Sequence, residues 1–315
     1  MVSFTGFKEE FLSQCQRTLS EVGVEDMRIE ERSVNKSQRG TLNGMVFIKE
    51  GLNCAPTLYV EDFYSAYRNG SSIRDLSREA IDTVVRGMDM AGLLAVNTDA
   101  LITDYGNLRV RLLNKVINRD YLRNMPSKEV GCGLVFIAEF EFGEYRAVIN
   151  NDLLNSMTIS KEELFEIALN NTIENYPAML CSLSDSLCVD EEDRENLLES
   201  ESKRAPLEAG PGFVLTNSRF YWGAGALFYP GVIERIHELL DDDFYVLPSS
   251  VHELILVGAD GQDPYSLIEM LQEANRTVVE EKDILSDDLY ICESGEFKRV
   301  SYGGEVRESM NEYLN

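Results

Sequence analysis

The stretch that decides the fold of the C-terminal part runs Phe244-Tyr-Val-Leu-Pro-Ser-Ser-Val-His-Glu-Leu-Ile-Leu-Val257. Phe244 to Leu247 is apolar and rich in residues that favour strands, and His252 to Val257 is a second run of this kind. The Pro-Ser-Ser segment between them is typical of a tight turn, because proline and serine favour turn conformations. The stretch therefore predicts two neighbouring strands joined by a short turn.

The segments on either side of this hairpin complete an alternation of strands and helices. Before it we expect a strand at 213–216 and a helix at 224–240. After it we expect a helix at 264–276 and a strand at 289–292. The proline of this helix falls in its first turn, where a backbone N–H would have no partner within the helix, so no hydrogen bond is lost. This β-α-β-β-α-β order is typical of a ferredoxin-like unit, which we expect to span residues 213–315.

The rest of the chain divides into two further units and a linker. Residues 1–90 combine an amphipathic N-terminal helix with short strands and a second helix, which predicts an α+β unit with a small sheet. Residues 91–184 predict a middle unit: a helix at 101–117, then a strand–strand–helix block. Residues 185–212 are acidic and contain proline and glycine, which indicates an exposed acidic helix and a loop. The fold class expected for the whole chain is α+β.

The composition is that of a folded, acidic protein. The 315 residues include 29 Lys and Arg against 55 Asp and Glu, a formal net charge of −26 at pH 7. Because a phosphate backbone is bound by clustered Lys and Arg, we expect no direct binding to nucleic acid or to a membrane surface. Basic residues gather on one expected helix, which we interpret as a solvated face: Arg109, Arg111, Lys115, Arg119 and Arg123.

Three features of the sequence favour a cytoplasmic location. No window reaches the roughly 18 apolar residues that a membrane helix needs. The first residues lack the basic and apolar regions of a secretory signal. The six cysteines form no Cys-x-x-Cys pair, so we expect free thiols in a reducing compartment.

The hairpin turn holds one of the two histidines of the chain beside two hydroxyl groups. On a strand, Ser250 and His252 would point the same way. A serine nucleophile needs an imidazole within hydrogen-bonding reach and a carboxylate on the other ring nitrogen. The candidate catalytic residues are Ser249, Ser250, His252 and Glu253. The alternative is structural: the hydroxyls bond backbone amides of a turn, and the histidine is a half-buried strand residue.

A second candidate site lies between the strand expected at 213–216 and the helix expected at 224–240. Backbone amides at the start of a helix can hold an anion, and small residues let a phosphate approach. The candidate ligand-binding residues are Asn217, Arg219, Gly223 and Gly225. No dinucleotide-binding or P-loop glycine motif is present. The alternative is that the glycines, next to the only tryptophan, allow close packing of helix on sheet.

Metal-binding patterns are weak in this sequence. His237 and Asp241 would share a helix face, but no second histidine completes a zinc site. The aspartate runs at 241–243 and 287–288 lack the spacing of a calcium-binding loop. We therefore expect neither a metal nor a cofactor.

Several short runs, spread over nearly the whole chain, are distinctive. They include Ala55-Pro56-Thr57-Leu58-Tyr59, Val214-Leu215-Thr216-Asn217, and the Leu-Pro-Ser-Ser-x-His-Glu run that ends at Glu253. These runs resemble an uncharacterised domain-of-unknown-function family of clostridial gut bacteria and their mobile elements. The resemblance implies a cytoplasmic bacterial protein of one architecture, and it supplies no catalytic residues.

These observations leave three hypotheses for the function. The first is a non-catalytic binding or regulatory accessory protein with an unknown protein partner, and a small-molecule ligand is compatible with it. The second is a hydrolase or nucleotide-handling enzyme, which predicts a pocket at the turn and a carboxylate on His252. The third is an acidic mimic of nucleic acid, which predicts a continuous acidic stripe.

Overall fold

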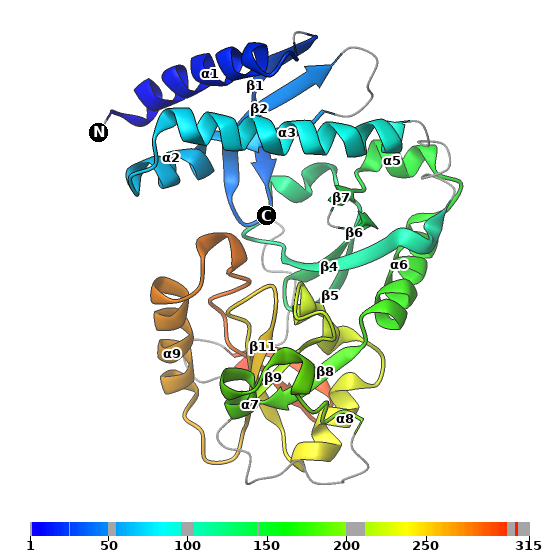
Figure 1. Cartoon of the computed structure of the whole chain (residues 1–315). Helices are drawn as coiled ribbons and strands as arrows, with labels where there is room; N and C mark the ends of the chain where they lie inside the picture. The colour runs from blue at the N-terminus through cyan, green and yellow to red at the C-terminus, as the bar shows by residue number, and fades with distance from the viewer. Residues whose placement is uncertain are drawn as a thin grey trace. The chain divides into compact units, whose positions relative to one another are not determined.

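The computed structural model describes residues 2–24, 26–49, 55–95, 104–143, 145–199, 212–300 and 306–307. The chain divides into two compact units, residues 1–104 and 105–315 (Figure 1). Both units combine helices with antiparallel sheets. The predicted α+β class is therefore confirmed.

The first unit is a three-stranded sheet with three helices (Figure 1). Its elements are α1 (Phe4–Glu21), β1 (Met27–Lys36), β2 (Gly40–Lys49), β3 (Thr57–Tyr59), α2 (Val60–Arg68) and α3 (Ile73–Ala95). Met45 and Phe47 of β2 point to the same face of the sheet, because side chains alternate along a strand. They join Phe7 and Phe11 of α1 in one buried core. This is the helix-plus-small-sheet arrangement that the sequence predicts.

The second unit contains a four-stranded and a seven-stranded sheet. The smaller sheet comprises β4 (Leu108–Asn114), β5 (Ser127–Gly131), β6 (Leu134–Phe142) and β7 (Tyr145–Val148). The larger comprises β8 (Ala178–Ser182), β9 (Phe213–Asn217), β10 (Phe244–Leu247), β11 (Leu254–Gly258), β12 (Tyr290–Glu293), β13 (Glu296–Val300) and β14 (Val306–Arg307). Its helices are α5 (Asn151–Ser156), α6 (Lys161–Asn175), α7 (Leu183–Cys188), the 3₁₀ helix η4 (Gly223–Phe228), α8 (Val232–Leu240) and α9 (Pro264–Thr277).

The helix predicted at 101–117 is wrong, because residues 108–114 form strand β4. Basic and apolar side chains alternate strictly from Leu108 to Leu112, and this two-residue period is that of a strand. Strand β6 pairs with β4 and places Glu139 opposite Arg109. The interpretation of Arg109 and Arg111 as a solvated face is therefore also wrong, since both are buried.

The strand order of the larger sheet differs from the predicted ferredoxin-like arrangement. Its order is β14-β13-β12-β10-β11-β9-β8, with all pairs antiparallel. Strands β9 and β10 flank β11, as in the first half of a ferredoxin-like unit. The second half differs, because β12 pairs with β10 and not with β9. The free side of β9 is taken by β8, which precedes the predicted linker.

The first part of the predicted linker lies against the outer edge of β8. The side chain of Asn196 accepts a hydrogen bond from the N–H of Leu180 and donates one to the carbonyl oxygen of Ala178. The N–H of Leu197 donates to the carbonyl oxygen of Leu180. These bonds satisfy backbone groups that an edge strand would otherwise expose. The proline- and glycine-rich part of the linker, 200–211, lies outside the described residues.

The described helices and cysteines bear on two further expectations from the sequence. No described helix combines the length and apolar character that a membrane span requires. The described cysteines are free thiols: Cys15, Cys132, Cys181, Cys188 and Cys292. Burial raises the pKa of Cys15 to about 12, so this thiol stays protonated at neutral pH.

Candidate functional site

The structure brings the two predicted site segments, 216–225 and 249–253, into direct contact. The N–H of Gly223 donates to the carbonyl oxygen of His252 at 2.9 Å, and the hydroxyl of Thr216 donates to the same oxygen at 2.8 Å. The N–H of Trp222 donates to Nδ1 of the His252 imidazole at 3.1 Å. The turn and the loop before η4 therefore form one cluster.

Both ring nitrogens of His252 are engaged, and neither contacts a serine. Because Nδ1 accepts from Trp222, the proton of the neutral ring lies on Nε2, which is 3.3 Å from Oδ1 of Asp283. The hydroxyl of Ser250 accepts from the backbone N–H of His252 at 3.0 Å. A nucleophilic serine needs an imidazole nitrogen free to take its proton. The carboxylate that the enzyme hypothesis predicts on His252 is present as Asp283. Among the described residues, however, no serine hydroxyl contacts the imidazole.

The other two candidate catalytic residues have backbone and surface roles. Ser249 is buried, and its carbonyl oxygen accepts from the N–H of Leu285 at 3.4 Å. Glu253 stays at the surface, where partial desolvation raises its pKa against the opposing charges of His252 and Arg194. The hydroxyl of Ser250 and the half-buried histidine thus have the contacts that the structural alternative predicts.

The two candidate glycines serve close packing. A Cβ atom at Gly223 would lie 2.2 Å from Oγ1 of Thr216 and 2.5 Å from the backbone nitrogen of Asn217. A Cβ atom at Gly225 would lie 2.9 Å from the ring of Phe136. Protein atoms fill the space beside both glycines, as the packing alternative predicts.

Asn217 shapes the loop that follows it. Its Oδ1 accepts from the N–H of Arg219 at 3.0 Å, and its Nδ2 donates to the carbonyl oxygen of Tyr221 at 3.1 Å. Within this loop Phe220 and Trp222 have φ angles of 54° and 56°, in the left-handed region that bulky residues rarely adopt. Such a conformation persists only where the surroundings fix it. Asn217 is one of the residues that do so.

Each of the four consecutive side chains 219–222 takes part in a cation–π contact, in which an arginine lies over an aromatic ring. The pairs, with the distance from guanidinium carbon to ring centroid, are Arg219–Tyr176 (5.3 Å), Arg194–Phe220 (5.1 Å), Arg146–Tyr221 (5.0 Å) and Arg111–Trp222 (4.5 Å). A cation is attracted to the negative face of an aromatic ring. The loop is therefore held by side chains from β4, β7, the end of α6 and the segment that follows α7.

Glu141 on β6 is the centre of a buried ion cluster that the sequence analysis missed. Its side chain is 5% exposed. Its partners, with distances to the carboxylate oxygens, are Arg146 (2.8 Å), Arg109 (3.3 Å), Arg219 (2.5 Å) and the hydroxyl of Tyr176 (2.5 Å). Burial would raise the pKa of Glu141, but the bonds from Tyr176 and Arg146 and the charge of Arg219 outweigh it and leave the pKa lowered. The carboxylate therefore stays charged.

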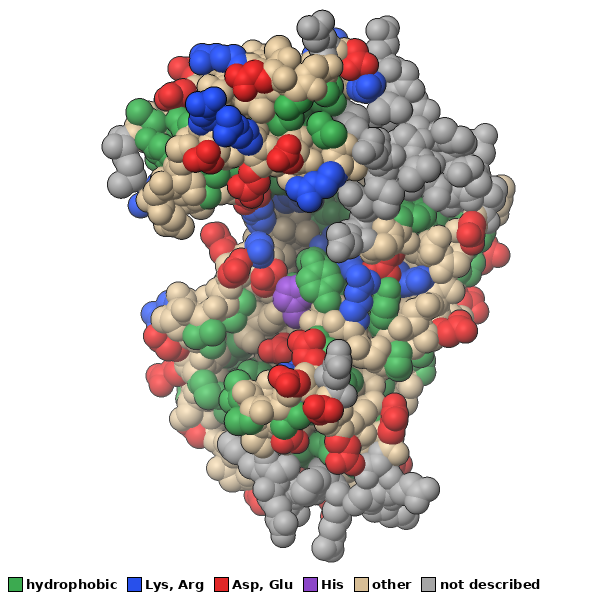
Figure 2. All heavy atoms as spheres, viewed as in Figure 1, with side chains coloured by type: hydrophobic (Ala, Val, Ile, Leu, Met, Phe, Trp, Pro, Cys, Tyr) green, Lys and Arg blue, Asp and Glu red, His purple; other side chains and the backbone are tan. Residues whose placement is uncertain are grey.

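Glu139, two residues before, extends the same cluster. Its carboxylate lies 3.2 Å from Nε of Arg111 and 3.3 Å from Nε of Arg146. Four guanidinium groups thus face two carboxylates, which gives the cluster a net charge of +2. On the face of the second unit shown in Figure 2, basic side chains gather beside a histidine while acidic side chains are spread over the rest.

A signal in the sequence could have revealed this cluster. Leu108 to Leu112 alternates apolar and basic residues, and Ala138 to Phe142 alternates apolar and acidic residues. Two strands with alternations of opposite charge are suited to pair, because opposite charges attract across neighbouring strands. The helix predicted at 101–117 is incompatible with this pairing of two strands.

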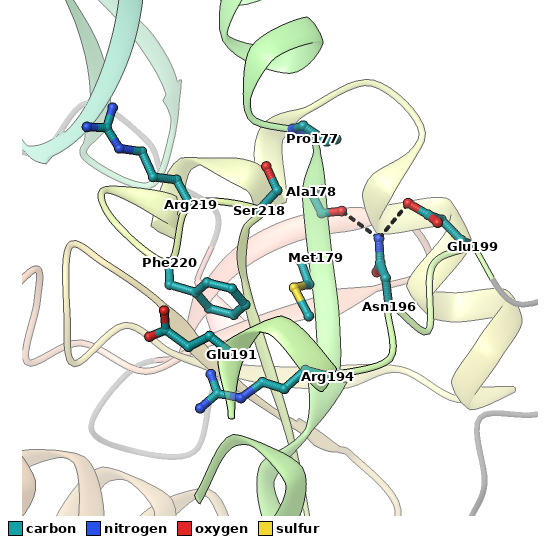
Figure 3. Close-up of a pocket in the computed structure, with 10 residues that line it drawn as sticks. All are labelled: Pro177, Ala178, Met179, Glu191, Arg194, Asn196, Glu199, Ser218, Arg219 and Phe220. Carbon is teal, nitrogen blue, oxygen red and sulfur yellow. Dashed lines mark hydrogen bonds between the residues drawn. The ribbon is translucent and has the colours of Figure 1, made fainter. Parts of the chain in front are cut away.

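Two open pockets of about 410 Å³ each meet at Arg219. The first lies along β8 and includes Met179, Arg194 and Phe220 (Figure 3). The second is lined by Asn107, Arg109, Glu141, Gly143, Tyr176 and Arg219. In Figure 3 the guanidinium of Arg219 points away from the other residues of the first pocket, and its ion pair with Glu141 places it in the second.

Arg219 is the most accessible guanidinium of the cluster. Its side chain is 36% exposed, against 22% for Arg146 and 11% for Arg109. Its Nη1 makes both of its bonds, to Glu141 and to Tyr176. Among the described residues its Nη2 has no partner. The arrangement can therefore accept a further oxygen ligand at Arg219. No group of three described His, Cys, Asp or Glu side chains is placed to hold a metal.

A protein-family model, described as a family of unknown function (DUF5688), matches residues 4–294. No curated protein and no solved structure matches the chain. The family match runs through both compact units and includes every residue of the site described above.

Proposed function

Because the chain belongs to a family of unknown function (DUF5688), we propose its function from the geometry of the site: a non-catalytic binding protein that holds an anionic group of its ligand at Arg219. One observation carries the proposal. Arg219 lines both open pockets and has an unpartnered Nη2 among the described residues, while Glu141 and Tyr176 hold its Nη1. A binding role of this kind fits an accessory or regulatory protein of the bacterial cytoplasm.

The chemistry of the guanidinium group selects an oxyanion as the ligand. Its planar N–H donors match the oxygens of a carboxylate or a phosphate. Because Glu141 and Tyr176 already fix the orientation of Arg219, less conformational freedom is lost when a ligand binds. The net charge of +2 on the cluster attracts an anion locally, even though the whole chain carries −26.

The contacts of His252 support a non-catalytic role. Its Nδ1 accepts from the backbone of Trp222, so it is not available as a base for Ser250. The hydroxyl of Ser250 itself accepts from a backbone N–H. The two pockets lie at Arg219, and neither is lined by a residue of the turn 248–253.

The proposal is tested by thermal denaturation of the full chain in phosphate, acetate and chloride at matched ionic strength. A ligand that binds only the folded state increases the free energy of unfolding, by about 2.7 kcal/mol at a hundredfold excess over Kd. The melting temperature therefore rises with the ligand concentration. We expect phosphate or acetate, but not chloride, to stabilise the wild type. We expect Arg219→Gln to lose this stabilisation.

Arg123→Gln is the matched control, because it removes the same charge from an exposed surface pair with Asp120. It should behave as the wild type does. Equal stabilisation of all three proteins, or no difference between the anions and chloride in the wild type, would contradict an anion site at Arg219. The comparison of phosphate with acetate identifies which oxyanion the site prefers.

A further inference from the structure

We propose that the ligand is a short peptide with a free C-terminal carboxylate, which binds across both pockets. The carboxylate lies on Arg219, and an apolar side chain of the peptide packs on Phe220 and Met179 in the first pocket. This inference rests on the proposed function, because Arg219 provides the anchor. It adds the class of ligand and a second set of contacts.

Four apolar side chains form part of the lining of the first pocket, here called its floor, and the other six lining residues are polar or charged. Figure 3 shows the ring of Phe220 and the side chain of Met179 near each other, with Ala178 and then Pro177 farther back along the chain. Small-ligand sites are mostly lined by apolar and aromatic side chains, with a few polar groups that fix orientation. An inorganic anion would leave this floor in water, whereas an apolar side chain would cover it and gain the hydrophobic free energy.

Phe220 is held in place before any ligand arrives. The guanidinium of Arg194 lies 5.1 Å from the centre of its ring. Arg194 is itself fixed, because its Nε donates to the carbonyl oxygen of Val189 and its Nη2 to that of Ser186. A prearranged aromatic surface lowers the entropy cost of binding.

The polar groups of the first pocket suit a peptide main chain. Glu191 is exposed and has no ion-pair partner among the described residues, so its carboxylate can accept a hydrogen bond from a peptide N–H. Ser218 also lines the pocket and offers a hydroxyl group, whereas the side-chain amide of Asn196 is already bonded within the protein. Each peptide unit carries one donor and one acceptor, so a peptide can use such a mixed set.

The size of the site also favours a peptide over a small anion. Two adjoining pockets of about 410 Å³ each lie within the range of sites that hold drug-sized ligands, about 300–1,000 Å³. Acetate or phosphate fills a small part of one pocket.

The chain carries its own reporter for this test, because Trp222 is the only tryptophan and follows Phe220 and Arg219 in the same loop. The full chain is titrated with acetylated alanyl-alanyl-phenylalanine as the free acid, with the same peptide as its C-terminal amide, and with acetate. Tryptophan fluorescence and calorimetry give the affinities. We expect the free acid to bind at least tenfold more tightly than either the amide or acetate.

Three variants separate the contributions. Arg219→Gln should abolish binding of both acids. Phe220→Ala should remove the advantage of the peptide acid over acetate and leave acetate binding unchanged. Glu191→Ala removes the acceptor from an exposed position and should weaken the peptide acid several-fold, so it provides a test that does not depend on the folding of Phe220→Ala.

The outcomes distinguish this inference from the proposed function. If acetate and the peptide acid bind equally and both need Arg219, the anion site stands and the peptide inference is overturned. If the amide binds as tightly as the acid and Arg219→Gln has no effect, both are overturned. Both are also overturned if neither method detects binding to the wild type.

Discussion

Glu141 is a buried carboxylate that stays ionised because of its neighbours. Burial alone would raise its pKa, yet the hydrogen bonds from Tyr176 and Arg146 and the charge of Arg219 lower it below the ordinary value of 4.5. A group whose pKa is lowered in the folded state stabilises the fold above its unfolded pKa. That contribution is lost as the pH falls through the folded-state pKa.

We expect Glu141→Gln to reduce the free energy of unfolding at pH 7 by about 3–5 kcal/mol, because breaking a buried ion pair leaves uncompensated charge. The difference from the wild type should shrink as the pH falls from 4.5 through the lowered pKa, where the wild-type carboxylate also becomes neutral. Urea denaturation of both proteins between pH 3 and pH 7 gives the difference in the free energy of unfolding at each pH. A difference of about 1.4 kcal/mol corresponds to a tenfold change in the unfolding equilibrium constant.

The control for this prediction is Glu129→Gln, in which an exposed carboxylate loses its pairing with Lys115. An exposed pair contributes at most about 1 kcal/mol, so this variant should stay close to the wild type. If Glu141→Gln lowers the free energy of unfolding equally at every pH, or by no more than Glu129→Gln does, the role given to the buried carboxylate is contradicted.

At the scale of residues, the sequence identified part of the site. Asn217, Arg219 and His252 stood out because rare or polar residues fell between predicted elements, and the structure places them in one cluster. Glu139 and Glu141 did not stand out, because a carboxylate in a chain with 55 acids is not unusual. Their role depends on strand pairing, which the sequence of one strand does not contain.

At the scale of elements, η4 depends on two positions that admit no side chain. A Cβ atom at Gly223 would lie 2.2 Å from Oγ1 of Thr216 and 2.8 Å from the carbonyl oxygen of His252. These atoms belong to β9 and to the turn after β10, so neither can move without loss of hydrogen bonds. Gly225 would contact the edge of the Phe136 ring, which has more freedom to shift.

We therefore expect Gly223→Ala to destabilise the protein by about 3 kcal/mol or more, and Gly225→Ala by about 1–2 kcal/mol, since overpacking costs depend on how far the neighbours can yield. Urea denaturation of both variants gives the two values. The single tryptophan, Trp222, reports the local change by fluorescence. A Gly223→Ala variant as stable as the wild type would show that the loop repacks freely.

Local signals predicted elements well, and long-range signals predicted their arrangement poorly. The proline in the first turn of α9 is present as predicted, because this signal depends only on neighbours within one helical turn. The hairpin of β6 and β7 is also present. The place of β12 beside β10 was missed, because it is decided by pairing between segments more than 40 residues apart.

At the scale of the whole molecule, each compact unit has its own buried core. The core of the first unit draws on α1, α2, α3 and β2, all within residues 1–104. We expect a fragment of residues 1–104 to fold by itself and to unfold in one cooperative transition, with a stability on the order of 5 kcal/mol. Circular dichroism during urea denaturation measures this. A fragment that is unfolded while the full chain is folded would contradict it.

The acidity of the chain hides a feature that net charge does not reveal. The chain carries −26, but the ion cluster of β4, β6, β7 and Arg219 carries +2 in a partly water-excluded place. Charges are screened over about 8 Å at physiological salt, so a ligand close to Arg219 responds mainly to its local surroundings. The net charge of the whole chain therefore does not argue against a small anion at this place.

The contacts of Asn196 with β8 have a consequence for the behaviour of the protein at high concentration. An uncovered edge strand is a template on which another molecule can add a strand, which leads to aggregation. Here the amide of Asn196 and the N–H of Leu197 occupy the N–H of Leu180 and the carbonyl oxygens of Ala178 and Leu180. One side chain and one backbone N–H thus take the place of a further strand at the β8 edge, and we expect them to hinder edge-to-edge association there.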